Sequence, residues 1–178
     1  EIDMSEGSWL ILAQAGYQLN PVSGELRSSG YLFNNRGHRS ISENISDAVN
    51  GWEQLRKGKE VNGAVARKIY SFMSTKDRVA RGFKKLTSVE DTDLLDLKAL
   101  TADHGLLATE DMVWHIAMDR MPESERAYII AMLRRGERFN GEPRITVSTI
   151  HGAKGGEADN VVLFTDLSPA SEEQMTIN

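Results

Sequence analysis

Residues 144–167, RITVSTIHGAKGGEADNVVLFTDL, decide the fold class of this 178-residue chain. Residues 145–148 alternate apolar and polar side chains, which predicts a half-buried strand. Residues 160–164 form a short, β-rich apolar run, which predicts a strand buried on both faces. Between them lie hydroxyl, imidazole, ammonium and carboxylate groups together with two adjacent glycines. Since ligands bind at the carboxyl ends of strands in open α/β sheets, this loop is the predicted functional site.

Residues 149–157, TIHGAKGGE, resemble motif V of the UvrD/Rep superfamily-one DNA helicases, whose pattern is T-I/L-H-x-A/S-K-G-L-E. Eight of the nine positions fit, and the exception is Gly156, where the family usually has Leu. The missing Leu predicts either a looser loop or another side chain that fills the gap.

The resemblance implies a role for each polar residue of this motif. Thr149 and His151 are expected to contact single-stranded DNA. Lys154 has two alternatives, pairing with a DNA phosphate or pairing with a neighbouring carboxylate that fixes the loop. Glu157 is expected near the ribose and γ-phosphate of ATP, with Gly155 beside it on the nucleotide-sensing side. Such a loop would link the state of the nucleotide to the grip on DNA.

Residues 11–19, ILAQAGYQL, are similar to motif IV of the same family, roughly L-x-R-S/T-N-x-Q. The family's Arg reaches the γ-phosphate of ATP, and the matching residue here is Gln14. Gln14 is therefore a candidate nucleotide sensor, although an amide cannot neutralise phosphate charge as a guanidinium does. Either another residue supplies that charge, or nucleotide hydrolysis is weakened. Gly16 stands at the family's Asn position.

The order of patterns along the chain predicts an α/β fold with an insertion. Residues 8–13, 21–30 and 31–33 read as strand, helix and strand, a βαβ unit with parallel strands. Six helices then follow, predicted at residues 42–58, 64–73, 78–86, 94–100, 109–118 and 122–135, with Ser42 and Thr109 as N-caps of the first and fifth. We therefore expect a partial RecA-like parallel sheet interrupted by an all-helical insertion, with boundaries at 1–40, 41–140 and 141–178.

The predicted insertion is divided by charge, although the whole chain carries a net charge of only −5. Residues 54–86 hold ten Lys and Arg against two acids, and residues 87–125 hold ten acids against two cations. One interpretation is two ordinary solvated faces that pack together. The other is a DNA-backbone patch, because phosphate binding requires clustered cations. The resemblance favours duplex contact by this insertion, with Arg81, Lys84 and Lys85 as candidate contacts.

The remaining features exclude several other classes. There is no Cys, so disulfides and thiolate metal sites are excluded. No apolar run approaches the ~20 residues of a membrane span, and the acidic start is unlike a signal peptide, so a cytoplasmic protein is expected. No metal site is predicted, because His38, His104 and His115 lack companions at metal-ligand spacing. Trp52 and Trp114 stand at helical core spacing, so we expect them to pack in the core. Tyr17 and Phe33 have two alternatives, stacking on bases or burial in the core, and core burial is favoured.

What is missing bears on catalysis. The sequence contains no G-x-x-x-x-G-K-S/T phosphate loop and no D-E-x-Q magnesium box, and it stops before the Arg-bearing motif VI of the family. Since Glu1 is not an initiator residue, we expect a piece of a longer protein. That protein would be an ATP-dependent DNA helicase using ATP and Mg²⁺, whereas this chain alone should be inactive and hold neither tightly.

The expected partners are single-stranded and duplex DNA and the missing first RecA-like domain, with no membrane partner and a monomeric state. Two alternatives stay open. One is a non-catalytic DNA- or protein-binding module with a degenerate helicase fold. The other is a subunit of a helicase–nuclease.

Overall fold

The structure, a computed structural model, describes residues 3–165 of the chain. These residues fold as two compact units. Unit 1 comprises residues 3–40 and 127–165, and unit 2 comprises Ile41–Arg126. Unit 2 thus lies within the sequence of unit 1 as an insertion. The sequence analysis placed residues 127–140 in the insertion, whereas the structure places them in unit 1.

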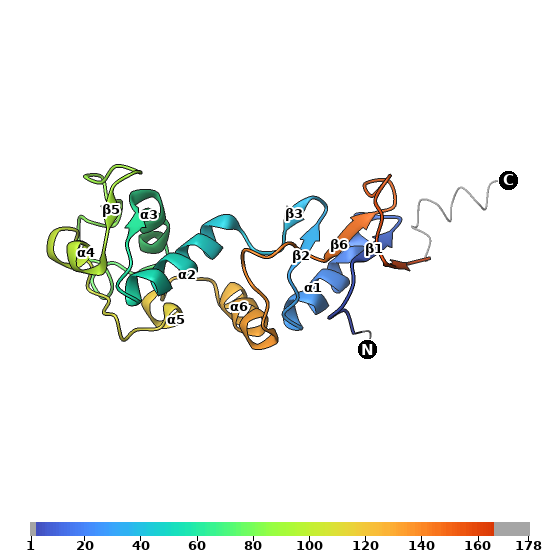
Figure 1. Cartoon of the computed structure of the whole chain (residues 1–178), viewed down its shortest axis with the longest axis horizontal. Coiled ribbons are helices and arrows are strands. Elements are labelled where there is room, and N and C mark those ends of the chain that lie inside the picture. The colour runs from blue at the N-terminus through green and yellow to red at the C-terminus, as the bar shows by residue number, and fades with distance from the viewer. Residues whose placement is uncertain (1–2, 166–178) are drawn as a thin grey trace. The chain divides into compact units, whose positions relative to one another are not determined.

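Unit 1 is built on a five-stranded, mostly parallel sheet with the order β3-β2-β6-β1-β7. β1 pairs in parallel with β6 on one side and with β7 on the other, and β2 pairs in parallel with β6 (Figure 1). Only β3 is antiparallel, as the second strand of a hairpin with β2. The strands are β1 (Trp9–Ala13), β2 (Phe33–Asn35), β3 (His38–Arg39), β6 (Ile145–Thr149) and β7 (Asn160–Leu163). The predicted α/β class with parallel strands is confirmed.

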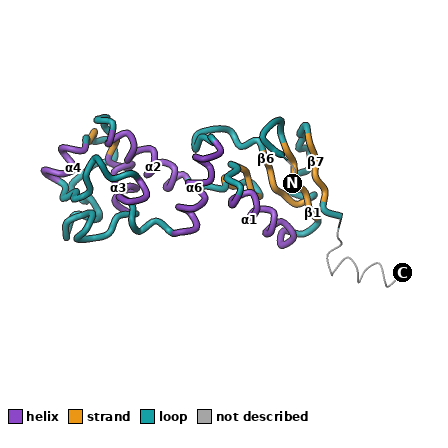
Figure 2. Tube along the Cα trace, turned by 90° about the horizontal axis from the view of Figure 1, so that it is seen from below, coloured by secondary structure: helices purple, strands orange, loops and turns teal. Residues whose placement is uncertain are grey.

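The two faces of this sheet differ in what covers them. The 3-10 helix η1 (Gly16–Leu19) and α1 (Asn20–Ser28) follow β1 and bury Leu19 and Leu26. In Figure 2, α1 lies along the sheet formed by β1, β6 and β7. One face of β1 and β6 is fully apolar, and its residues are Ile11, Ala13, Ile145 and Val147, each no more than 1% exposed. The opposite face carries Thr146 and Ser148 and is the side on which a groove forms.

The C-terminal part of α6 (Glu123–Arg135) packs within unit 1. The Tyr128 hydroxyl donates a 2.6 Å hydrogen bond to the carbonyl of Tyr31, and the Arg135 guanidinium lies 3.7 Å from the centre of the Tyr31 ring. At Gly30 a Cβ atom would come within 2.4 Å of the Ala131 carbonyl, so only glycine permits this approach. These contacts explain why residues 127–135 belong with the sheet.

Two strand predictions are corrected in detail. The second strand begins at Phe33 rather than at residue 31, because Tyr31 and Leu32 are buried in the connection that follows α1. The last strand was predicted to be buried on both faces, but Val161 is 58% and Leu163 is 51% exposed. Within residues 3–165, β7 pairs only with β1, so it is an edge strand with one covered face. Asp166 and Leu167 lie outside the described residues.

Unit 2 is mainly helical, but the prediction of an all-helical insertion is wrong. β4 (Val61–Asn62) and β5 (Leu94–Leu95) form an antiparallel pair, and residues 72–93 are irregular. The side chains of Ser42, Asn62 and Asp96 each accept a hydrogen bond from the backbone N–H three residues ahead, and so cap three of the helices. The helices are α2 (Glu43–Arg56), α3 (Gly63–Ser71), α4 (Leu97–Asp103) and α5 (Trp114–Ala117).

The predicted helix at residues 78–86 does not form. Val79 is fully buried and pairs with Leu106, and Leu107 donates its N–H to the carbonyl of Arg78. Positive φ angles at Gly82 (+92°) and Leu86 (+46°) are also incompatible with a right-handed helix. Long-range pairing therefore overrides the local helical spacing.

The predictions for the rest of unit 2 are partly correct. The helix predicted at residues 94–100 begins as β5, and α4 starts only after the Asp96 cap. The helix predicted at 109–118 is reduced to the four residues of α5, because the Thr109 hydroxyl donates to the carboxylate of Asp111 instead of capping a helix. Trp52 and Trp114 are buried, as predicted.

Candidate functional site

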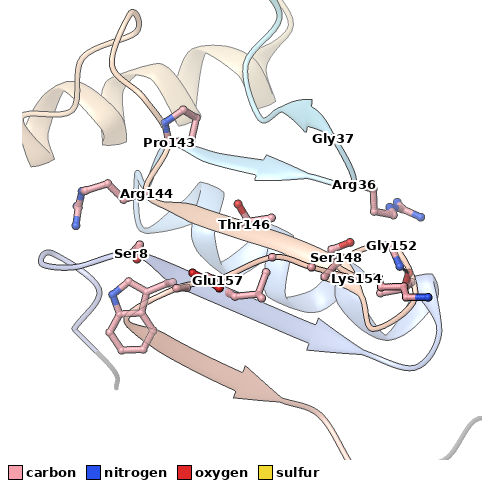
Figure 3. Close-up of a pocket in the computed structure, with 17 residues that line it drawn as sticks. Ser8, Arg36, Gly37, Pro143, Arg144, Thr146, Ser148, Gly152, Lys154 and Glu157 are labelled. Atoms are coloured by element: carbon pink, nitrogen blue, oxygen red, sulfur yellow. Dashed lines mark hydrogen bonds between the residues drawn. The ribbon is translucent and has the colours of Figure 1, made fainter.

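A groove of about 750 Å³ lies in unit 1 on the polar face of β1 and β6. Its other wall is the crossover, residues 150–159, which leaves the carboxyl end of β6 and returns to the start of the parallel strand β7 on the far side of β1. In Figure 3 the groove side chains lie in front of the strands and α1 lies behind them. The crossover thus spans the sheet from one end of its strands to the other.

Thr149 folds the start of the crossover. Its Oγ1 accepts the N–H of Gly152 at 3.1 Å, and its carbonyl accepts the N–H of Ala153 at 3.0 Å. The carbonyl of Ala153 in turn accepts the N–H of Gly156 at 2.8 Å. These bonds fold the first part of the crossover through its backbone and the Thr149 hydroxyl, without using Lys154 or Glu157.

Gly152 is required by close packing at this turn. A Cβ atom there would lie 2.9 Å from Ser148 Oγ and 3.1 Å from Thr149 Oγ1. Ser148 is buried near the end of β6, so its hydroxyl would have to shift to make room for that atom. A larger residue at position 152 would therefore separate the turn from the strand that it follows.

The other end of the crossover is held by Ser8 and Asp159. The backbone N–H and the hydroxyl of Ser8 each donate to Asp159 Oδ2 at 2.8 Å, and Ser8 Oγ accepts the N–H of Asp159 at 2.9 Å. Because the Ser8 N–H and hydroxyl stabilise the carboxylate, the pKa of Asp159 lies below its ordinary value. The crossover is therefore fixed to the sheet at both of its ends.

The structure brings together most of the site residues that the sequence predicted in this loop. Thr149, Lys154, Gly155 and Glu157 all line the groove. Figure 3 places Lys154 near Gly152 at the carboxyl end of the strands, and Glu157 further along the groove toward Ser8. His151 is exposed and is not part of the groove wall.

The ion pairs made by the groove residues bear on the two alternatives for Lys154, a phosphate partner or a carboxylate partner. Lys154 and Glu157 are exposed, and no ion pair within residues 3–165 includes either of them. Among the described residues, Lys154 therefore has no carboxylate partner that fixes the loop. Gln14 follows β1 as an exposed residue outside the groove wall.

Gly156 occupies the position of the family's Leu. A Cβ atom there would lie 3.1 Å from the Ala153 carbonyl oxygen and 3.8 Å from Leu10 Cδ2. Leu10 of β1 is thus the apolar surface that a Leu at position 156 would cover. The sheet itself supplies the apolar contact at this point, and the crossover contributes only backbone.

Two residues that the sequence analysis did not assign to a site lie at the same edge of the sheet. Arg36, in the turn after β2, lines the groove near Lys154 (Figure 3). Tyr17, in η1 after β1, was predicted to be core but is 57% exposed. Phe33 is 1% exposed, as predicted for a core residue. The dipeptide Arg36-Gly37 within a basic, turn-rich segment was the available sequence signal.

The three cations predicted to contact DNA in unit 2 differ in their surroundings. The ammonium of Lys84 is half-buried and donates to the carbonyls of Tyr70, Ser71 and Met73 at the end of α3. Burial lowers the pKa of Lys84. Arg81 and Lys85 are exposed, and no ion pair in the described chain includes them. Lys84 thus has a structural role that the other two lack.

Comparison with protein-family models, curated proteins and solved structures finds no match to this chain. Within residues 3–165, no helix is both long enough and apolar enough to cross a membrane. The same residues contain no group of three or more His, Asp or Glu side chains arranged to hold a metal ion. The groove and the sequence motif that forms its wall are therefore the features that bear on function.

Proposed function

We propose that this chain is part of an ATP-dependent DNA helicase or translocase of the UvrD/Rep type. In this proposal, unit 1 is most of the second RecA-like domain and unit 2 is its insertion. The observation that carries the proposal is the crossover: residues 149–157 follow a central parallel strand and form one wall of a polar groove. The chain's role is to contact single-stranded DNA and sense nucleotide, with the phosphate loop supplied by another domain.

The groove has the chemistry that a nucleic-acid backbone requires at the carboxyl end of the strands. Lys154 offers a cation, and Thr149 offers a hydroxyl proton, because its oxygen already accepts from Gly152. The exposed imidazole of His151 lies on the same turn. Cations and hydroxyls of this kind position phosphates without reading base sequence. Contact with single-stranded DNA of any sequence follows from this set.

The nucleotide-sensing role is assigned to Glu157, at the other end of the same crossover. The Ala153 N–H donates to the Thr149 carbonyl, and the N–H of Gly156, immediately before Glu157, donates to the Ala153 carbonyl. A displacement of Glu157 by bound nucleotide would therefore pass along hydrogen-bonded backbone to the Thr149 turn. This relay is a physical route by which ATP could alter the grip on DNA.

The decisive experiment measures binding of fluorescent oligothymidylate to the 178-residue chain as a function of salt. Lys154→Gln and Glu157→Gln are a matched pair, since each neutralises one exposed charge of the same groove. Lys154→Gln should weaken binding several-fold and reduce the log–log salt slope by about 0.7 per lost phosphate contact. Glu157→Gln should leave binding unchanged or slightly tighter. Equal effects of the two variants, or no binding by the unaltered chain, would reject the DNA-contacting role.

Unit 2 supplies a second DNA surface in this proposal. Arg81 and Lys85 are exposed cations on the irregular segment 72–93, and they fit the backbone of a duplex. Lys85→Gln should weaken binding to forked DNA more than binding to a single strand. An identical loss on both substrates would assign Lys85 to general attraction rather than to the duplex.

A non-catalytic binding module is the second candidate. Gln14 and Gly156 favour it, since both depart from the family pattern at positions tied to ATP coupling. The complete reading frame separates the two candidates. A phosphate loop before this segment and an Arg-bearing motif after it support the helicase, and their absence supports the binding module. ATP hydrolysis by this chain alone would contradict both.

A further inference from the structure

Arg36 occupies a backbone position that does not suit its side chain. Asn35 and His38 are paired across the β2–β3 hairpin, which leaves Arg36 and Gly37 as a two-residue turn. Both have positive φ, +50° and +85°, as in a type I′ turn. Asn-Gly is the sequence that such turns favour, and Arg at positive φ is uncommon. A residue held in a disfavoured conformation at a strand end indicates a function for its side chain.

The surroundings of Arg36 fix its backbone and keep its guanidinium accessible. Its N–H donates to the carbonyl of Val147 at 2.8 Å, which ties the turn to β6. Its Nε makes only a long 3.4 Å contact with Asn35 Oδ1. No ion pair within residues 3–165 includes Arg36, and the residue is exposed. The positive charge is thus available to a ligand.

Gly16 provides the space in which the guanidinium lies. A Cβ atom on Gly16 would be only 2.9 Å from Arg36 Nη1. Gly16 has no positive φ, so its lack of a side chain matters here for room rather than for backbone freedom. The guanidinium therefore lies beside the turn that follows β1, and it also lines the groove that contains Lys154 (Figure 3).

Tyr17 is the next residue along the chain from Gly16, and it is 57% exposed. This exposed ring adjoins Gly16, the residue next to the Arg36 guanidinium, whereas Tyr31, Phe33 and Tyr128 of unit 1 are buried. Exposed aromatic rings with neighbouring cations are the arrangement by which proteins bind single-stranded nucleic acid, with the ring stacking on a base and the cation taking a phosphate.

We infer that Arg36 and Lys154 hold a phosphate of single-stranded DNA and that Tyr17 stacks on an adjacent base. This subsite rests on the proposed function and extends it to residues outside the motif V loop. It also places a cation at the end of β1, where Gln14 offers only an amide. A base together with a phosphodiester, rather than an isolated phosphate, is the ligand that uses both the ring and the guanidinium.

The test uses the 178-residue chain, oligothymidylate, and an abasic oligomer with the same number of phosphates. Arg36→Asn removes the charge but suits the turn, so folding is preserved, while Arg36→Lys keeps the charge. Arg36→Asn should weaken binding to both oligomers about tenfold and reduce the salt slope by about 0.7. Arg36→Lys should lose much less. Gly16→Ala, which displaces the guanidinium without removing it, should give an intermediate loss.

Tyr17 is tested by the difference between the two oligomers. Tyr17→Leu should weaken oligothymidylate binding about fivefold or more and leave abasic binding unchanged, because stacking requires a base. Tyr17→Phe should retain the affinity for both oligomers.

Several outcomes would overturn the subsite. If the unaltered chain binds oligothymidylate but Arg36→Asn changes neither affinity nor salt slope, the subsite is wrong and the proposed function survives. An equal effect of Tyr17→Leu on both oligomers would exclude stacking. If ATP competes with oligothymidylate, and Arg36→Asn weakens inhibition by ATP but not binding of the oligomer, Arg36 belongs to a nucleotide site instead. No binding by the unaltered chain would remove both proposals together.

Discussion

The crossover of unit 1 and the irregular segment of unit 2 hold their shapes in opposite ways. The crossover, residues 150–159, is fixed by Thr149, by its own backbone and by the Ser8–Asp159 pair, so that Lys154 and Glu157 remain exposed. The segment at residues 72–93 is fixed partly by its cations. The Lys84 ammonium donates hydrogen bonds to backbone carbonyls at the end of α3. In return, the guanidinium of Arg67, which lies on α3, donates to the carbonyls of Leu86 and Val89.

This difference shows that counting the cations in a segment does not reveal how many of them are free to bind an anionic ligand. The crossover is held by Thr149, Ser8 and the carboxylate of Asp159, whereas its other charged residues, Lys154 and Glu157, are left exposed. In unit 2, Lys84 and Arg67 are used to satisfy backbone carbonyls, and only neighbours such as Arg81 and Lys85 are left exposed.

Lys84→Met should destabilise unit 2 by about 2 kcal/mol, because three carbonyls at the end of α3 lose a charged donor. Lys85→Met is the matched control, and its exposed side chain should change the stability by less than about 0.5 kcal/mol. Urea unfolding followed by tryptophan fluorescence measures both, in a Trp9→Phe background so that only Trp52 and Trp114 of unit 2 report. Equal stabilities of the two variants would show that Lys84 is not a structural cation.

Thr149→Val should loosen the start of the crossover at a cost of about 1 kcal/mol, because the Gly152 N–H loses its acceptor. Thr149→Ser keeps the hydroxyl and should behave like the unaltered chain. The rate of amide hydrogen exchange at Gly152 and Ala153 measures this loosening at the turn itself. Faster exchange is expected in the Val variant and not in the Ser variant. Unchanged exchange at Gly152 would mean that the charged residues, not Thr149, hold the loop.

Arg36→Asn should stabilise unit 1 by up to about 1 kcal/mol, because Asn tolerates positive φ better than Arg in this turn. Thermal unfolding monitored by circular dichroism measures the change, and Arg36→Lys should show no gain. If Arg36→Asn gains stability and also loses oligonucleotide binding, Arg36 serves ligand binding and not stability, in contrast to Lys84. A destabilised Asn variant would instead make Arg36 structural, like Lys84.

The Ser8–Asp159 pair should give a small, pH-dependent contribution. The folded pKa of Asp159 is lowered, so this contribution is fully present above the ordinary pKa of 3.8 and is lost as the pH falls through the folded value. Ser8→Ala should therefore be less stable than the unaltered chain near neutral pH, with the difference shrinking below pH 3.8. A difference that does not vary with pH would assign the effect of Ser8 to packing.

Patterns within short stretches of sequence correctly predicted the features that depend only on neighbouring residues. Alternation identified β6, the hydroxyl of Ser42 identified the start of α2, and Trp52 at helical spacing identified a core residue. The helix predicted at residues 78–86 failed because the pairing of Val79 with Leu106, distant in sequence, outweighs helical spacing. No pattern within the segment itself records that pairing.

The candidate site was predictable where it is contiguous in sequence. Thr149, Lys154, Gly155 and Glu157 stand together in one motif and together line one groove. Arg36 joins them only through the sheet order, which places β2 beside β6. For Tyr17 the sequence left base stacking open but favoured core burial, whereas the side chain is 57% exposed. The exposure of Tyr17 depends on the surroundings of η1, which composition does not reveal.

The strand order also constrains how the chain can fold during synthesis. β6 lies between β1 and β2, yet it begins at Ile145, more than a hundred residues after β2 ends. The ribosome therefore makes both flanking strands, and then all of unit 2, before the strand that joins them exists. Closing that gap is a long-range step, which is slow in folding. If unit 2 becomes compact first, it shortens the effective loop, and the insertion then assists the assembly of the sheet that it interrupts.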